Sequence, residues 1–483
     1  MARRRSALLV LCSVPVLIMG CTTDKAGQPA PTPTLTDALP GDPGAGDAYY
    51  PNDGNGGYDA LDYHVDVGFD PATRHLDGDT TVTAKATRNL SRFNLDLRGL
   101  DVKSVQVNDK PAKFTREDEF ELVITPAEPV AKDSMFRARV LYSGTPAGAQ
   151  LSGTGESDIG ESGWQKSASG GAYVLGEPHS AAYWYPVNET PLDKAAFNLT
   201  ARVPDGWSAI SNGREEGTTS ADGWTTSAWS EPNPVASYLT TLAIDKFTFE
   251  RSTLPGGVPV VDAYAPGAEA RRAAGSQVPA VLAFLATKFG PYPQSAAGGI
   301  YLDENLHFSL ETQTRPTYAR WADISTVVHE NAHQWFGDSV SVKSWADICL
   351  NECFASYAQW LWAEKDGSDL NDRFLRAVEK YKNSKDFWAP PLYDMGPGQE
   401  FEGVYDKGIL AVHALRAKIG DEAFNRVLKE WPAKYRHSNA SWSDFEEFVT
   451  AVAGQDLRSF LDAWFRGTTI PGDADLFPGT LRR

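Results

Sequence analysis

Apolar and polar residues alternate along the first half of the chain, from Tyr58 to about Phe249. Residues 63–67, 80–84 and 120–124 place every second side chain on one face, which is typical of strands that bury one face. Turn residues recur about every ten positions between such stretches. The pattern predicts a largely antiparallel β domain.

The spacing of the apolar residues changes after Ala265. From there they recur every three or four positions, as in residues 270–289 and 325–336, which is the spacing of helices that bury one face. We therefore expect an α+β multidomain chain. Its expected parts are an N-terminal antiparallel β domain over residues 49–249, a mainly helical domain over residues 250–467 and a tail over residues 468–483.

The N-terminus has a pattern of its own. Arginines at positions 3–5 precede an apolar stretch, residues 7–19, that is too short for an ordinary membrane span, as in an export signal. Residues 18–21, Ile-Met-Gly-Cys, resemble the lipobox of bacterial lipoproteins, in which the cysteine carries the lipid. We expect residues 1–21 to be a lipoprotein signal peptide.

Residues 22–48 are rich in Pro, Gly and Thr and show no apolar periodicity, so they are predicted to form a flexible tether. The folded domains are then expected outside the cytoplasmic membrane, on the bacterial cell surface. The lipid on Cys21 would be their only membrane contact.

Composition and charge narrow the range of partners. The chain has 483 residues, with 42% hydrophobic and 22% charged residues, as in an ordinary globular protein. Asp and Glu total 63 against 45 for Lys and Arg, which gives a formal net charge of -18. Because phosphate binding needs a basic surface, and no basic run follows Arg5, a nucleic-acid partner is not expected.

The strongest chemical signal is the sequence His-Glu-Asn-Ala-His at residues 329–333. Histidines four residues apart lie on one helical face, so His329 and His333 can bind one metal ion, with Glu330 beside them as a base. Glu352, in a second predicted helix, adds a third ligand and leaves a fourth position for water. Chance placement would produce the two-histidine pattern about 0.007 times per chain of this composition.

This set of ligands predicts one zinc ion per chain. Two imidazoles and one carboxylate with a hydrolytic base beside them are the pattern of zinc hydrolases. Iron oxygenases share the ligand types but lack the adjacent base that Glu330 provides.

The segment His-Glu-Asn-Ala-His-Gln-Trp-Phe-Gly-Asp at residues 329–338, followed by Leu-Asn-Glu at residues 350–352, resembles the aminopeptidase N family of gluzincin zinc metallopeptidases. The similarity extends from about Tyr58 to Phe465. It implies a saddle-like β domain followed by a thermolysin-like catalytic domain, without the further C-terminal helical domain of the family.

The resemblance also implies roles for three other residues. Tyr405, in Val-Tyr-Asp-Lys-Gly, matches the tyrosine that hydrogen-bonds the tetrahedral oxyanion. Glu311 stands where the family has a Gly-X-Met-Glu-Asn signature, and would bind the α-ammonium of the substrate. Glu177 has the spacing of the family's second amine-binding acid.

The chain departs from the family pattern at two places. The segment Phe-Ser-Leu-Glu-Thr at residues 308–312 keeps only the Glu of the family signature. Its Gly and Asn are lost, and Thr312 stands in place of the Asn. Cys349 and Cys353 replace the usual Trp and Gly. Cβ atoms four apart on a helix are about 6 Å from each other, whereas a disulfide needs about 3.8 Å. We therefore expect these two cysteines to be small, buried and unbonded.

The expected function is hydrolysis of the N-terminal peptide bond of peptides by a zinc-bound water that Glu330 activates. Two alternatives remain open at this point. An endopeptidase of the same fold is motivated by the altered segment around Glu311 and the missing C-terminal domain. A surface binding lipoprotein without activity would require the loss of a ligand or base, and none is lost.

Overall fold

The computed structural model describes residues 37–149 and 162–481. The predicted signal peptide, its Cys21 and residues 22–36 of the predicted tether lie outside the described residues. Among the described residues, no helix is long and apolar enough to cross a membrane.

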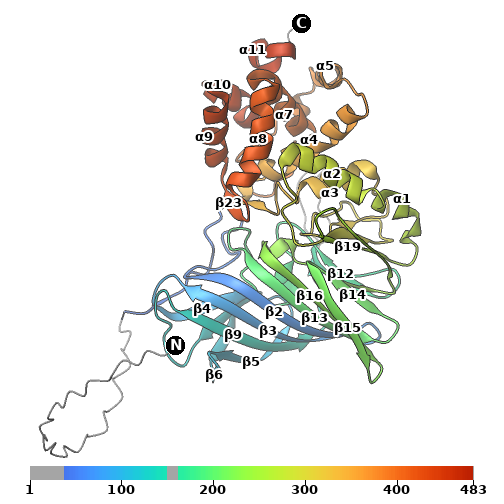
Figure 1. The fold of residues 1–483 in the computed structure, drawn as a ribbon. Helices are drawn as coiled ribbons and strands as arrows, with labels where there is room; N and C mark the ends of the chain where they lie inside the picture. The colour runs from blue at the N-terminus through green and yellow to red at the C-terminus, as the bar shows by residue number, and fades with distance from the viewer. Residues whose placement is uncertain (1–36, 150–161, 482–483) are drawn as a thin grey trace, which may run out of the picture. The chain divides into compact units, whose positions relative to one another are not determined.

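The first half of the chain folds into β-sheets (Figure 1). The largest has eight strands, in the order β15 (Arg214–Ala221), β16 (Trp224–Val235), β13 (Ala195–Pro204), β2 (Tyr58–Asp70), β3 (His75–Ala86), β9 (Met135–Gly144), β5 (Asp101–Val107) and β6 (Lys110–Pro111). Neighbouring strands are antiparallel except β13 and β2, which run parallel. The prediction of a largely antiparallel β domain is confirmed.

Two smaller sheets complete this domain. One has the order β1 (Leu39–Pro40), β4 (Leu90–Asp96), β8 (Glu121–Thr125) and β7 (Lys113–Glu117). The other has the order β10 (Gly148–Ala149), β11 (Ser162–Lys166), β12 (Ala172–Leu175), β17 (Leu242–Asp245) and β14 (Ser208–Ser211).

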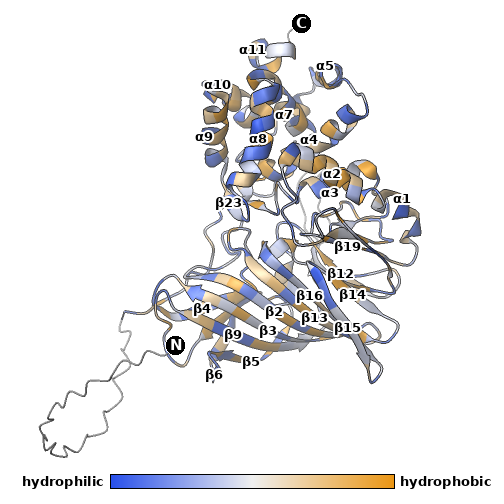
Figure 2. Cartoon of the chain, viewed as in Figure 1, coloured by the Kyte–Doolittle hydropathy of each residue, from blue (hydrophilic) through white to orange (hydrophobic). Residues whose placement is uncertain are grey.

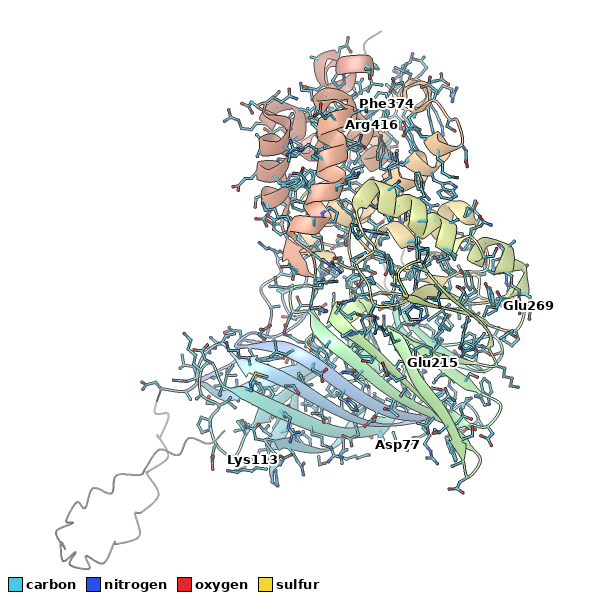
Figure 3. All side chains as sticks on the ribbon, viewed as in Figure 1. Asp77, Lys113, Glu215, Glu269, Phe374 and Arg416 are labelled. Carbon is cyan, nitrogen blue, oxygen red and sulfur yellow. A yellow bond between two sulfur atoms is a disulfide. The ribbon has the colours of Figure 1, made fainter. Side chains whose placement is uncertain are left out.

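Side chains alternate between core and solvent along the long strands. On β2, Val65, Val67 and Phe69 are buried while the residues between them are more exposed, and the hydropathy of the strands alternates accordingly (Figure 2). Asp77 on β3 and Lys113 on β7 are two of the exposed polar side chains on these strands (Figure 3). This period of two is what turns the sequence pattern into sheets with one apolar face.

The second half of the chain is mainly helical. A four-stranded sheet comes first, in the order β18 (Thr248–Thr253), β19 (Pro259–Tyr264), β20 (Ala297–Tyr301) and β21 (Thr317–Tyr318), and β22 (Val340–Val342) pairs with β23 (Ser438–Ala440). The helices are α1 (Arg272–Gly275), α2 (Val278–Phe289), α3 (Ile324–Ala332), α4 (Cys349–Lys365), α5 (Leu370–Tyr381), α6 (Lys385–Trp388), α7 (Asp406–Ile419), α8 (Asp421–Lys434), α9 (Trp442–Ala453), α10 (Arg458–Leu461) and α11 (Asp473–Leu476).

The single helix expected over residues 270–289 is divided into α1 and α2. Pro279 explains the second start, because proline has no N–H to donate and is tolerated in the first turn of a helix but not in its interior. The expected helix over residues 325–336 ends at Ala332, and His333 caps it.

Both ends of the described chain are attached to the folded body. Leu39 and Pro40, in the expected tether, pair with β4 as strand β1, and the Asp47 carboxylate accepts a hydrogen bond of 2.9 Å from the backbone N–H of Trp345. In the expected tail, the side chains of Leu476 and Leu481 are buried. Backbone pairing and apolar burial hold these stretches in place.

The two cysteines of α4 form a disulfide, so the prediction of unbonded cysteines is wrong. Both residues are buried, as expected, but their Cα atoms are only 4.8 Å apart. Cys349 is the first residue of α4 and follows a 3₁₀ turn, where the backbone is not held to the spacing of a regular helix interior.

Candidate metal and peptide-binding site

Helix α3 carries the two histidines of the predicted metal site. It begins at a capping residue, Asp323, whose Oδ1 accepts hydrogen bonds from the backbone N–H groups of Ser325 (2.9 Å) and Thr326 (3.0 Å). His329 and His333 follow one turn apart on the face that looks toward α4. The local sequence thus determines both the start of the helix and the common direction of the two imidazoles.

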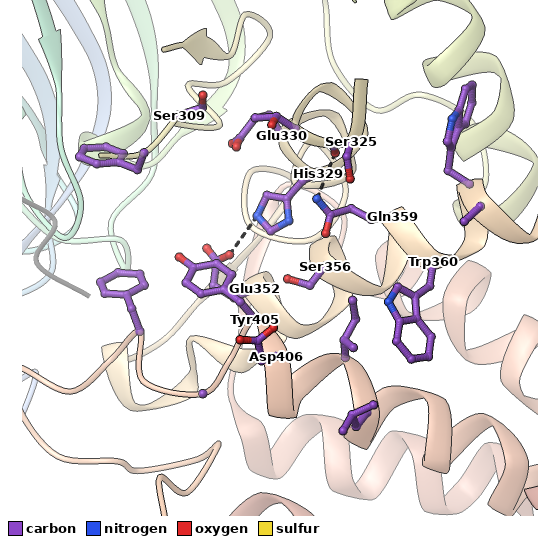
Figure 4. A pocket seen from close by; sticks show the side chains of 18 of the residues that line it. Ser309, Ser325, His329, Glu330, Glu352, Ser356, Gln359, Trp360, Tyr405 and Asp406 are labelled. Carbon is purple, nitrogen blue, oxygen red and sulfur yellow. Dashed lines mark hydrogen bonds and ion pairs between the residues drawn. The ribbon is translucent and has the colours of Figure 1, made fainter. Parts of the chain in front are cut away.

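The three predicted ligands meet at one point, and Figure 4 shows two of them, His329 and Glu352, side by side. His329 Nε2 lies 3.2 Å from Glu352 Oε2 and 3.1 Å from His333 Nε2, and His333 Nε2 lies 3.5 Å from Glu352 Oε2. Ligand atoms at zinc-binding distance around a tetrahedral ion are separated by about 3.3 Å. The donor set and its spacing therefore fit zinc.

A backbone carbonyl orients His333. Its Nδ1 lies 3.0 Å from the Phe336 carbonyl oxygen, which can only accept, so Nδ1 carries the proton and Nε2 is free for a metal. Gly337 makes this turn possible, since its φ of +131° suits glycine and an added Cβ would lie 3.2 Å from His333 Nδ1.

Glu330 is buried between the histidines and a further acid. Oxygen atoms of Glu330 and Glu311 and a ring nitrogen of His333 lie within 4.8 Å of one another. Burial raises the pKa of Glu330 well above its ordinary value, and the charges of Glu311 and Glu352 raise it further, against the opposing effect of His333. The position of Glu330 beside the metal ligands suits a general base.

Glu177 and Glu311 lie beside the metal ligands. One oxygen each of Glu177, Glu311 and Glu352 lies within 4.8 Å of the others, and all three residues are buried. Burial raises the pKa of Glu177 well above its ordinary value, and repulsion from Glu311 and Glu352 adds to it. Oε1 of Glu177 has no hydrogen-bond partner among the described residues. This cluster has an excess of negative charge that cations would offset.

Two residues that support Glu311 were missed by sequence reasoning. The Tyr238 hydroxyl donates to Glu311 Oε1 over 3.4 Å, and the Gln334 side-chain amide donates to the Glu311 carbonyl oxygen over 3.3 Å. Gln334 follows the second histidine directly, and this adjacency was the only available signal. For Tyr238, which comes from the β domain, the sequence gives no signal.

The altered signature around Glu311 has a structural replacement. The Thr312 hydroxyl donates to the Arg315 carbonyl oxygen over 2.5 Å and pairs with the Thr317 hydroxyl at 3.0 Å. The fully buried Arg315 guanidinium then donates to backbone carbonyls of Ser211 and Gly213 in the β domain. The loop that carries Glu311 is thereby held without the Asn of the family signature.

Tyr405 stands at the N-terminal end of α7, with its ring centroid 6.0 Å from that of His329 (Figure 4). The adjacent Lys407 is buried, and its Nζ donates to the carbonyl oxygens of Trp388 (3.2 Å), Pro390 (2.6 Å) and Gly467 (2.8 Å). These three hydrogen bonds fix the start of α7, and with it the position of the Tyr405 phenol.

The two helices that carry Tyr405 and Glu352 approach each other closely. A Cβ added at Gly408 of α7 would lie 2.6 Å from Cys353 Sγ of α4. Only glycine allows this approach, because any side chain at position 408 would displace one helix from the other.

The metal ligands and the residues closest to them border one cavity of about 1230 Å³. Its wall contains the predicted ligands, Glu330, Tyr405, Glu311 and Glu177. The arrangement combines a metal site, a buried base, a hydroxyl donor and two further buried acids. Such a set can bind a cationic group next to a bond that is being hydrolysed.

Comparison with known proteins identifies the family. The model of the peptidase family M1 domain matches residues 298–464, and that of the M1 N-terminal domain matches residues 59–239. The chain belongs to peptidase family M1. Its cofactor is zinc, as the donor set indicates, and the expected fold class, a β domain followed by a helical catalytic domain, is confirmed.

A solved structure covers almost the same length. The M1 zinc metallopeptidase from Deinococcus radiodurans is similar with a TM-score of 0.81 and 30% identity, over 89% of this chain and 98% of that chain. A variant of that enzyme has been crystallised with a Tyr-Ser-Ala substrate.

Curated relatives are longer than this chain. Glutamyl aminopeptidase from Rattus norvegicus is 26% identical over 69% of this chain and 38% of its own length. Leucyl aminopeptidase from Saccharolobus solfataricus is 26% identical over 78% of this chain and 49% of its own length. The chain thus spans half or less of the length of these relatives.

Proposed function

We propose that the protein is a zinc-dependent aminopeptidase that removes the first residue from peptides with a free N-terminus. The observation that carries this proposal is the pair of buried acids, Glu177 and Glu311, beside the zinc ligand Glu352. The aminopeptidase relatives and the tripeptide substrate of the Deinococcus enzyme support it.

The acids explain why cleavage would occur at the first bond. A substrate α-ammonium between Glu177 and Glu311 would offset their mutual repulsion and give Glu177 Oε1 the partner that it lacks. Because these acids lie within 4.8 Å of the Glu352 oxygen, an ammonium there leaves room for one residue before the reacting carbonyl. By holding the N-terminus, the two acids would therefore place only the first peptide bond at the metal.

The chemistry follows from three groups. Zinc, when bound through His329, His333 and Glu352, supplies a Lewis acid and an acidified water. Glu330 takes a proton from the attacking water and delivers it to the leaving amine. The hydroxyl of Tyr405 donates a hydrogen bond to the oxyanion that forms at the substrate carbonyl.

The decisive experiment compares a free tripeptide with its N-acetylated form. Acetylation removes the ammonium charge and leaves two buried carboxylates facing a neutral group, so we expect kcat/KM to fall ~100-fold or more. Glu311→Ala should lose most of this discrimination, mainly by impairing the free-amine substrate. Asp366→Asn is the matched control, because Asp366 borders the same cavity outside the acidic cluster.

Equal cleavage of both peptides by the wild type, at an internal bond, would contradict the proposal and favour an endopeptidase. No cleavage of any peptide by zinc-loaded protein would favour a binding lipoprotein. In the same assay, Glu330→Gln should retain zinc but lower turnover at least ~100-fold, the lower end of the range for a lost general base.

We propose in addition that the protein is lipid-anchored at the outer face of the cytoplasmic membrane through Cys21. The support is in the sequence, where a cationic stretch and a short apolar stretch end in Ile-Met-Gly-Cys. Cys21→Ala should move the protein from the membrane fraction to the soluble fraction in cell fractionation. Membrane retention of this variant without detergent would contradict the assignment.

A further inference from the structure

One wall of the active-site cavity is cationic although the chain as a whole is acidic. Helix α5 contributes three positively charged side chains to this wall, Arg373, Arg376 and Lys380. The formal net charge of the chain is -18, so a local group of three cations is not a consequence of composition. Such a group would attract an anionic part of a bound molecule.

Among the described residues, neither Arg373 nor Lys380 has a carboxylate partner, and of these two only the Arg373 guanidinium is planar. Arg376 has an ion pair with Asp372, and Lys380 donates to the Tyr381 hydroxyl. The Arg373 guanidinium instead lies over the ring of Trp360, 4.9 Å from its centroid, and among the described residues it has no carboxylate partner. Burial lowers its pKa, and the positive charge of Arg376 lowers it further.

One acid of the cavity wall is already engaged. Asp366, which also borders the cavity, pairs with Lys365 at 3.2 Å. An anion at Arg373 would relieve the repulsion from Arg376 and could take two parallel hydrogen bonds from the planar guanidinium. The stacking on Trp360 holds that plane in one orientation.

The distance from the zinc ligands to this cation suits a short peptide. Trp360 follows Glu352 by eight positions on α4, which corresponds to about 12 Å along the helix axis. An extended peptide spans about 3.3 Å per residue, so about three or four residues cover that length. In Figure 4, His329 and Glu352 lie between Ser309, near the Glu311 loop, and Trp360.

We propose that Arg373, supported by Arg376 and Lys380, binds the C-terminal carboxylate of short peptide substrates. This rests on the proposed aminopeptidase function and deepens it by naming the substrate class. The acids at one end of the cavity bind the ammonium, and the cations at the other end bind the carboxylate. The site therefore selects tripeptides and tetrapeptides with both termini free over long chains.

The experiment compares tripeptides and tetrapeptides that carry a free C-terminal carboxylate with the same peptides as C-terminal amides. For the wild type we expect kcat/KM to be ~10-fold higher for the free acids, as for a charge-assisted hydrogen bond pair. Arg373→Ala should reduce this ratio to within about twofold of unity, and Arg373→Lys should restore part of it. An aminoacyl-coumarin, which ends before Arg373, should be cleaved equally by all variants.

Lys429→Ala is the matched control, because it removes one positive charge from an exposed lysine of α8 that does not border the cavity. It should keep the preference for the free acid. Equal rates for acid and amide in the wild type would overturn the inference while leaving the aminopeptidase intact, and failure to cleave any peptide would instead contradict the proposed function. The inference would also be overturned if the wild type preferred aminoacyl-coumarins with an acidic amino acid and Arg373→Ala abolished this preference. That result would place Arg373 next to the first residue of the substrate.

Discussion

The metal site and the two acids proposed to bind the substrate amine occupy the same cavity but are assembled differently. His329, His333 and Glu352 come from two helices that follow each other closely in sequence, and their supports are local, such as the Asp323 cap and the Phe336 carbonyl. Glu177 and Glu311 come from distant segments of two domains.

Long-range hydrogen bonds hold Glu311 and its loop in place. Arg315 connects the Glu311 loop to the β domain, and Tyr238 reaches Glu311 from that domain. Lys194 of the β domain donates to the Asp338 carbonyl oxygen over 2.6 Å, just after the zinc helix. The difference teaches that the metal site is encoded locally, whereas the proposed selection for a free N-terminus would depend on how the two domains are joined.

The largest expected effect is the loss of a metal ligand. His333→Ala leaves two ligands and no further histidine nearby, so the purified protein should lose bound zinc and nearly all peptidase activity. The zinc content of the purified soluble part, residues 49–483, measures this loss. His64→Ala, in an exposed histidine of β2, is the control and should retain one zinc per chain. Stoichiometric zinc in the His333 variant would show that the metal lies elsewhere.

Next in size is the loss of the oxyanion donor. Tyr405→Phe keeps the ring but removes the hydroxyl, so kcat should fall ~100 to 1000-fold while zinc content stays at one per chain. Steady-state kinetics with an aminoacyl-coumarin give the comparison. A rate near that of the wild type would remove Tyr405 from the mechanism.

A smaller effect should follow from breaking the connection between the domains. Arg315→Met leaves backbone carbonyls of Ser211 and Gly213 without their buried donor, so the free energy of unfolding should fall by about 2–4 kcal/mol. If amine recognition depends on this connection, discrimination against acetylated peptides should drop at least ~10-fold with zinc retained. Urea unfolding and paired kinetics test both parts. If the variant lost zinc to the same extent as it lost this discrimination, the metal site and the two acids would not be independent of each other.

The smallest effect is expected at Tyr238. Tyr238→Phe removes one long hydrogen bond to Glu311, so kcat/KM for free-amine peptides should fall ~3 to 10-fold, and cleavage of acetylated peptides should not change. Equal changes for both classes of peptide would mean that Tyr238 acts on the fold rather than on the amine site.

The sequence predicted most of the architecture because the two periodicities are strong. Alternation along β2 and three-to-four spacing in the helical half each bury one face, and no tertiary contact had to be known to read them. The division of the helix before Pro279 and the bond between Cys349 and Cys353 were not predicted. Both depend on local backbone geometry that departs from regular helix spacing.

By itself, the sequence determined the chemistry of this protein: a histidine pair on one helical face, a base beside it and a third ligand on the next helix, all within a short stretch of chain. Only the tertiary structure decided which other groups support and surround that centre. Tyr238 and Arg315 hold Glu311 and its loop, and Arg373 borders the cavity; their spacing in the sequence carries no signal. These contacts arise when the β domain and the helices pack together, because packing determines which distant side chains become neighbours.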